Sequence, residues 1–227
     1  MKHLLLVSFL VVSFLGYAQN WEFEKPDYSV IKKNIENKNS GLFYETLMGR
    51  FVEADTTLTL EEKRHLYYGY SFNENYSPYS RSKLNDTLRV IMQKETLSPD
   101  DLTNVLQFSE TILKTNPFDL RSYNRQLYVY EQLRDRENYD KTIRRRDMIV
   151  DALISSGDGT SKEDSFYVIY TAHEYDLIQI VGLDFGGMQQ LIEHYDYLTV
   201  AENDAGLEGL YFDVSPCLNS MSAKLKK

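Results

Sequence analysis

The residues best suited to contact a ligand are aromatic, and they crowd into one stretch of the chain. Residues 57–79 read TLTLEEKRHLYYGYSFNENYSPY. A tyrosine combines a large rigid ring with a polar hydroxyl, which suits stacking on a sugar or holding a peptide. The candidate ligand-binding residues of this tyrosine loop (residues 68–79) are Tyr68, Tyr70, Phe72, Tyr76 and Tyr79. The alternative is that the rings only fix the loop to neighbouring helices, because large apolar groups are usually buried.

Histidine and acidic side chains form weaker patterns. Glu61 and His65 lie four residues apart on an expected helix. A zinc protease helix needs two histidines in His-Glu-x-x-His spacing, so we expect this pair to be an ordinary surface ion pair.

A second acidic group lies near the C-terminus. His173, Glu174 and Asp176 could ligate a metal together with His194 or Asp196. Their spacing fits no standard site, and Thr171 with Glu174 has the pattern of a capping box at a helix start. We therefore predict no metal site.

Other catalytic signatures are missing from the sequence. It contains no Gly-x-Ser-x-Gly elbow, no phosphate loop and no dinucleotide fingerprint, so no cofactor is predicted. A carboxyl pair for glycoside hydrolysis cannot be selected among 34 acidic residues, because the separation in space decides it.

The tyrosine loop follows a helix whose start is encoded locally. Thr59 and Glu62 form a capping box, in which each side chain bonds to a backbone amide of the first turn. Gly69 is expected to end this helix in the left-handed conformation. The sequence of residues 57–79, together with the closing run Leu210-Tyr-Phe-Asp-Val214, resembles that of the bacterial DUF4919 family. The resemblance extends over nearly the whole mature chain. The resemblance implies an exported protein and an architecture, but no activity.

The first 18 residues have the features of a signal peptide. Lys2 precedes the apolar run 4–15, and Gly16 and Ala18 are small residues at the −3 and −1 positions of a cut after Ala18. The run is shorter than the ~20 residues of a membrane span, and no cysteine follows the cut. We expect a cleaved protein in the periplasm or secreted medium, without a membrane anchor.

Composition limits the partners. The net charge is −9, and loss of Lys2 with the signal peptide brings it to −10. This argues against nonspecific nucleic-acid binding, which needs a basic surface. Cys217 is the only cysteine, so no internal disulfide can form, and we expect the thiol to be buried.

Residues 19–157 are expected to be helical. Helical spacing and start signals predict seven helices, which begin near Asp27, Leu42, Thr59, Ser82, Ser98, Asp119 and Glu137. The turn Asn116-Pro117 between two of them resembles the junction of tetratricopeptide (TPR) repeats, although no 34-residue consensus fits. Arg144, Arg145 and Arg146 are expected to face solvent beside acidic residues rather than to bind an acidic partner.

Residues 158–227 are expected to be rich in strands. Strands are predicted over 166–170, 189–194, 196–201 and 207–214, with a short helix from Thr171 to Val181, a turn at Gly186-Gly187 and the end of order at Pro216. Helices followed by strands indicate an α+β fold. The expected architecture is a repeat-like helical bundle followed by a small, mostly antiparallel sheet with one inserted helix, packed as one unit.

These features favour a binding or protein-interaction module that is not an enzyme. Its partner would be a protein, held in a helical groove or by the tyrosine loop. Two alternatives stay open: a hydrolase or lyase acting on an extracellular polymer, and a carbohydrate-binding protein that uses the tyrosine loop.

Overall fold

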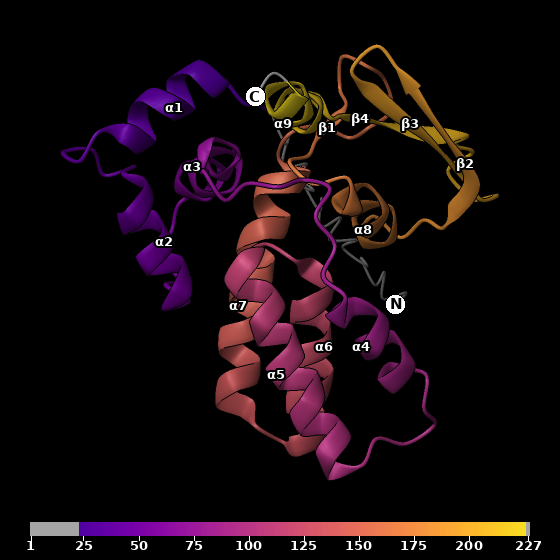
Figure 1. The fold of residues 1–227 in the computed structure, drawn as a ribbon. Coiled ribbons are helices and arrows are strands. Elements are labelled where there is room, and N and C mark those ends of the chain that lie inside the picture. Colours follow the sequence, from indigo (N-terminus) through magenta and orange to yellow (C-terminus); the bar gives the residue numbers. More distant parts are fainter. Residues whose placement is uncertain (1–22, 226–227) are drawn as a thin grey trace, which may run out of the picture.

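The computed structural model describes residues 23–225, so the expected signal peptide lies outside the described residues. Seven α-helices come first within this range (Figure 1). They are α1 (Tyr28–Glu36), α2 (Tyr44–Val52), α3 (Leu60–Gly69), α4 (Leu84–Met92), α5 (Pro99–Thr115), α6 (Leu120–Leu133) and α7 (Arg136–Ile154), with a short 3-10 turn η1 (Tyr70–Phe72) after α3.

A four-stranded mixed sheet and two more helices follow. Their order is β1 (Phe166–Tyr167), α8 (Ala172–Ile180), β2 (Phe185–Ile192), β3 (Tyr195–Val200), β4 (Gly209–Asp213) and α9 (Ser215–Leu225). This confirms the predicted α+β fold, with helices first and one short helix inserted after the first strand.

The sheet has the order β1-β4-β3-β2. β1 runs parallel to β4, while the β2–β3 and β3–β4 pairs are antiparallel. β2 therefore lies at one edge. The expected turn at Gly186-Gly187 is wrong, because both glycines belong to β2 at an irregularity in its pairing with β3.

Local signals predict the helix starts well. Thr59 and Glu62 form both bonds of the capping box, at 3.2 Å from the Glu62 amide to Thr59 Oγ1 and 2.7 Å from the Thr59 amide to Glu62 Oε2. Ser98 caps α5, with Pro99 at its first position, and Asp119 caps α6.

Three local predictions are wrong. Gly69 is helical rather than left-handed, and the chain continues directly into η1. Thr171 makes no capping bond, because Glu174 turns toward the sheet instead of toward the helix start. Pro216 lies in the first turn of α9, where proline is tolerated, rather than ending the order.

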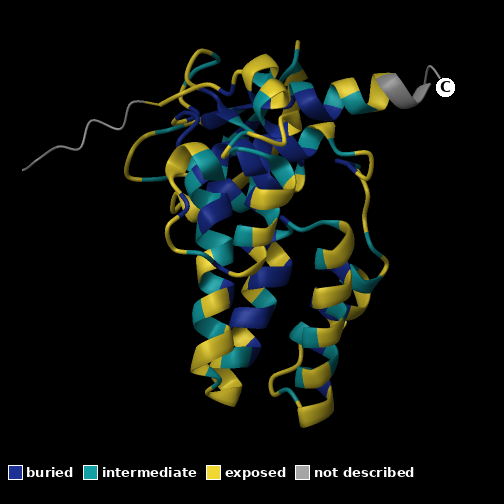
Figure 2. Cartoon of the chain, turned by 90° about the vertical axis from the view of Figure 1, so that its left-hand side faces the viewer, coloured by how far each residue is buried: buried dark blue, intermediate teal, exposed yellow. Residues whose placement is uncertain are grey.

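One large hydrophobic core joins the helical and strand-rich parts. It contains Tyr67 and Tyr68 of α3, Leu153 of α7, Leu177 of α8 and Phe212 of β4, all almost fully buried. Figure 2 shows this buried centre in the upper half of the molecule, while the far ends of the long helices are largely exposed. α3 thus packs at the junction, and it delivers the tyrosine loop there.

Helices α4, α5 and α6 share a second, smaller hydrophobic core. Leu88 and Ile91 of α4 pack with Val105 and Ile112 of α5 and Val129 of α6. α5 packs on α6 and α6 packs on α7, but tetratricopeptide-like character is not confirmed. Over residues 23–225, no helix combines the length and the apolar character that a membrane crossing requires.

Candidate functional site

The structure divides the five predicted aromatic site residues into two groups. Tyr68, Tyr70 and Tyr76 are buried, whereas Phe72 and Tyr79 remain 39% and 48% exposed. The tyrosine loop therefore both anchors itself to the core and presents rings to solvent.

Hydrogen bonds explain the buried group. The Tyr68 hydroxyl donates to the carbonyl of Ala152 at 3.0 Å, and the Tyr76 hydroxyl donates to the carbonyl of Ile169. Each bond ties the loop to a segment far away in the sequence. Tyr68 lies entirely within the core, so it is not available to a ligand.

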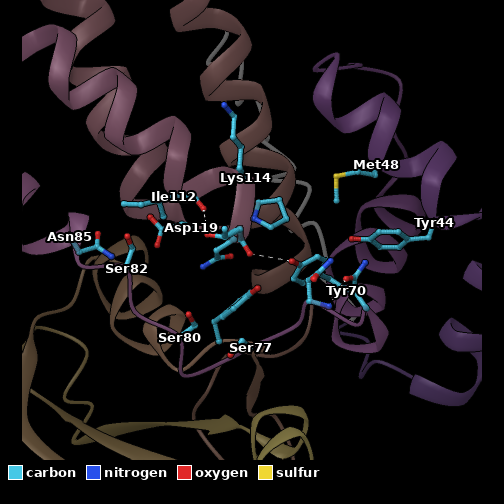
Figure 3. A pocket seen from close by; sticks show the side chains of 16 residues that line it. Tyr44, Met48, Tyr70, Ser77, Ser80, Ser82, Asn85, Ile112, Lys114 and Asp119 are labelled. Atoms are coloured by element: carbon cyan, nitrogen blue, oxygen red, sulfur yellow. Dashed lines mark hydrogen bonds between the residues drawn. The ribbon is translucent and has the colours of Figure 1, made fainter.

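A hollow with a volume of about 720 Å³ lies beside the tyrosine loop. Figure 3 shows this loop pocket, with α2 on one side, the start of α6 and the end of α5 behind, and residues 73–85 in front. Its lining comprises Tyr44, Met48, Tyr70, Asn73, Asn75, Ser77, Ser80, Ser82, Asn85, Ile112, Lys114, Thr115, Asn116, Pro117, Asp119 and Tyr170.

Amide groups give the loop pocket a surplus of donors. The side-chain oxygens of Asn73, Asn85 and Asn116 already accept hydrogen bonds, from the Asn75 amide, from Arg125 and from the Phe118 amide. Among the described residues, their NH₂ groups make no hydrogen bond. These donors are free to bind acceptor oxygens of a ligand.

Tyr44 adds a hydroxyl that lacks a partner. Its oxygen is buried and has no hydrogen-bond partner among the described residues. Burial raises the pKa of the Tyr44 hydroxyl well above its ordinary value, so the group stays a neutral phenol. Figure 3 shows the hydroxyl end of the ring directed into the pocket, toward Tyr70. A buried polar group without a partner is costly, and a ligand oxygen would remove that cost.

Charged groups contribute little to the loop pocket. Asp119 Oδ1 accepts from the Ser122 amide at 2.7 Å and so serves as the cap of α6. Lys114 extends away from the other labelled side chains in Figure 3. Asp119 is the single acidic residue among the described lining residues, which therefore offer no carboxyl pair for acid–base catalysis.

The sequence pattern missed most of this site. Tyr44 comes from a different helix, and the serines and asparagines of residues 73–85 looked only like loop composition. The many asparagines and serines of residues 73–85 were the one sequence signal that could have indicated a polar binding pocket. Of the five aromatic candidates, Tyr70 alone lines the loop pocket, while Phe72 and Tyr76 line a neighbouring hollow of about 440 Å³ between the loop and α9.

The histidine candidates have structural partners. The expected Glu61–His65 ion pair is wrong: His65 Nδ1 donates to the backbone carbonyl of Glu61, and Nε2 accepts from the amide of Asn34. His173 is fully buried between Tyr67 and the Phe118 carbonyl. No group of three or more potential ligands within residues 23–225 could hold a metal ion.

Two of the acidic candidates do meet. Glu174 and Asp196 share the side-chain amide of Gln189, at 3.2 Å and 2.8 Å, and Gln189 and Asp196 line a different hollow from the loop pocket. Cys217 lies nearby and is buried and free, as expected, and burial raises the pKa of its thiol to about 12.

Comparison with known proteins gives one result. The family model described as a domain of unknown function, DUF4919, matches residues 29–223. No curated protein and no solved structure matches the chain.

Proposed function

Because the chain belongs to the family DUF4919, whose description assigns no activity, we propose from the geometry of the loop pocket that it is a binding module for a neutral, hydroxyl-rich ligand such as an oligosaccharide. The observation that carries the proposal is the buried Tyr44 hydroxyl, which has no partner and points into a pocket lined by free amide donors.

The chemistry of the lining supports a sugar ligand. Sugar hydroxyl and ring oxygens accept hydrogen bonds from amide NH₂ groups, and the faces of Tyr44, Tyr70 and Tyr170 can contact the apolar faces of sugar rings. A volume of about 720 Å³ falls in the range of small-molecule sites.

Binding is favoured over catalysis at this place. The lining lacks the paired carboxyl groups of a glycoside hydrolase, and Asp119 is engaged as a helix cap. The role is therefore capture or presentation of a ligand. The signal-like residues 1–18 support the same setting, a periplasmic or secreted protein that meets extracellular glycans.

A protein partner is a second candidate, and a different surface supports it. β2 is an edge strand of eight residues with no charged residue and no proline. Phe185, Met188 and Leu191 of this strand are each at least 40% exposed. Natural edge strands usually carry charge or proline that prevents pairing, so an uncharged edge is suited to the addition of a partner strand. Replacing Met188 and Gln190 by lysine would abolish such binding and leave binding at the loop pocket intact.

The test of the glycan proposal is a binding screen with one informative variant. The mature protein is applied to arrays of neutral oligosaccharides, and hits are measured by calorimetry. Tyr44→Phe removes the unpaired hydroxyl but keeps the ring. We expect it to weaken binding about tenfold, while its melting temperature stays the same or rises, since an unsatisfied buried group is lost.

The matched control is Tyr28→Phe. Tyr28 also has a buried hydroxyl without a partner among the described residues, but it lines the hollow next to α9 rather than the loop pocket. This variant should bind as tightly as the wild type. If the two variants bind a glycan hit equally well, or if no neutral oligosaccharide binds, the proposal is wrong.

A further inference from the structure

A second hollow, separate from the loop pocket, is bordered by one member of a buried carboxyl pair. It has a volume of about 410 Å³ and is lined by residues of α8, β2, β3 and α9 and by the last residue of the tyrosine loop. Tyr79 and Tyr175 contribute rings, Leu191, Leu218 and Met221 contribute apolar surface, and Asp196 contributes a carboxyl group. No lysine, arginine or histidine of the described residues lines it.

The carboxyl pair is held in a fixed arrangement. The amide of Gln189 donates to Glu174 Oε2 and to Asp196 Oδ2, and the Tyr175 hydroxyl donates to Gln189 Oε1 at 2.5 Å. Glu174 is fully buried, and Asp196 is 7% exposed. Asp196 is therefore the member of the pair that borders the hollow.

The charge of this pair is uncompensated. Neither Glu174 nor Asp196 belongs to any ion pair of the described residues. Burial, and then the neighbouring charge of Asp196, raise the pKa of Glu174 to about 9, so Glu174 is a neutral acid at pH 7. As a carboxylate its Oε1 would have no partner, whereas as an acid it can share its proton with Asp196. Among the described residues, no cationic side chain forms an ion pair with Asp196.

We propose that this hollow, the ammonium pocket, binds an organic ammonium group on a short apolar stem, with Asp196 as its counter-ion and Tyr79 and Tyr175 beside it. A buried carboxylate is stabilised by a nearby cation, and among the described lining residues Asp196 has only the Gln189 amide as a side-chain partner. Tyrosine rings attract cations through their faces, and the leucine and methionine side chains suit the stem. This site is independent of the loop pocket and of the glycan proposal.

Two sources could supply the same chemistry: a free alkylamine, or a lysine side chain of another protein. The probes are n-butylammonium and Nα-acetyl-lysine methylamide, with 1-butanol as the neutral control. We expect wild-type protein to bind n-butylammonium at least tenfold more tightly than 1-butanol by calorimetry at pH 7. If Nα-acetyl-lysine methylamide binds as tightly as n-butylammonium, the natural ligand is a lysine side chain. If only n-butylammonium binds, the natural ligand is a free alkylamine.

Three variants locate the site. Asp196→Asn should abolish the preference for ammonium over butanol, and Tyr79→Leu should weaken ammonium binding while leaving the fold intact, because Tyr79 is 48% exposed. The control Asp204→Asn removes one charge from an exposed turn and should bind like the wild type. Loss of binding in that control, or unchanged ammonium preference in Asp196→Asn, would overturn the proposal.

Proton release gives an independent readout. A bound cation favours the ionised form of Glu174, so binding at pH 8 should release protons, measured as a dependence of the binding heat on the ionisation enthalpy of the buffer. Glu174→Gln should still bind n-butylammonium but without proton release. Equal proton release in wild type and Glu174→Gln would contradict the assigned site.

Discussion

The hydroxyl of Tyr67 lies 2.6 Å from Nδ1 of His173, deep in the core between α3 and α8. Nε2 of His173 donates to the carbonyl of Phe118 at 2.9 Å, so Nδ1 is the acceptor and Tyr67 is the donor. The Tyr67 oxygen in turn accepts from the Ile169 amide at 3.2 Å. Burial lowers the pKa of His173, which keeps the ring neutral. One hydroxyl of α3 thus satisfies two buried groups four residues apart, the Ile169 amide and the His173 ring.

Loss of this hydroxyl should be costly. Tyr67→Phe keeps the ring but leaves His173 Nδ1 and the Ile169 amide buried without partners, so we expect the free energy of unfolding to fall by about 1–3 kcal/mol. Urea denaturation followed by circular dichroism measures it. Tyr128→Phe on the exposed side of α6 is the control and should change stability by less than about 0.5 kcal/mol. If Tyr67→Phe and Tyr128→Phe are equally stable, the Tyr67 hydroxyl does not bond to His173 and Ile169 in the folded protein.

The helix starts could be predicted from sequence because their signals are local. Thr59 caps α3 together with Glu62, and Ser98 caps α5 with Pro99 at its first position, and both predicted caps are found. Thr171 with Glu174 has the same local pattern, but burial against β2 and β3 draws Glu174 away from the helix start. Tertiary packing therefore decided between two identical signatures.

The candidate sites could be predicted only in part. The tyrosine loop is visible in the sequence, but its division into core rings and exposed rings depends on the bonds of Tyr68 to Ala152 and of Tyr76 to Ile169, which are 84 and 93 residues away. Tyr44 and Asn85 reach the loop pocket from helices on either side of the loop. Glu174 of α8 and Asp196 of β3 meet at Gln189 of β2, through helix–sheet packing and strand pairing that no local spacing encodes.

Glu174 should make stability depend on pH. Its pKa rises from an ordinary 4.5 to about 9 in the fold, so the unfolded chain releases its proton first as pH increases. This contribution to stability is complete below pH 4.5 and is lost progressively up to about pH 9, with a slope approaching 1.4 kcal/mol per pH unit. Glu174→Gln removes the titrating group. The difference in unfolding free energy between variant and wild type should therefore grow in favour of the variant from pH 5 to pH 8.5, measured by urea titration at each pH. A difference that does not change with pH would show that Glu174 is ionised in the fold.

Tyr76 and Tyr79 lie three residues apart but should respond differently to truncation. Tyr76 is 6% exposed and bonded to Ile169, so Tyr76→Ala should destabilise the protein by about 2–5 kcal/mol. Tyr79 is 48% exposed, and Tyr79→Ala should stay within about 0.5 kcal/mol of the wild type. Thermal melting of both variants measures this. Similar melting temperatures would mean that the loop is not anchored through Tyr76.

Gly69 and Gly49 form a matched pair of helical glycines. A Cβ on Gly69 would lie 3.1 Å from Cδ1 and 3.2 Å from Cγ2 of Ile35, whereas a Cβ on Gly49 would meet nothing within 4 Å. Alanine is favoured over glycine in a helix by about 0.5–1 kcal/mol, so Gly49→Ala should stabilise the protein by about that amount. Gly69→Ala should show no gain or a net loss, because Ile35 of α1 must move to admit the methyl group. Chemical denaturation of both variants measures the contrast, and an equal gain at the two positions would show that α1 and α3 are not packed closely at Gly69.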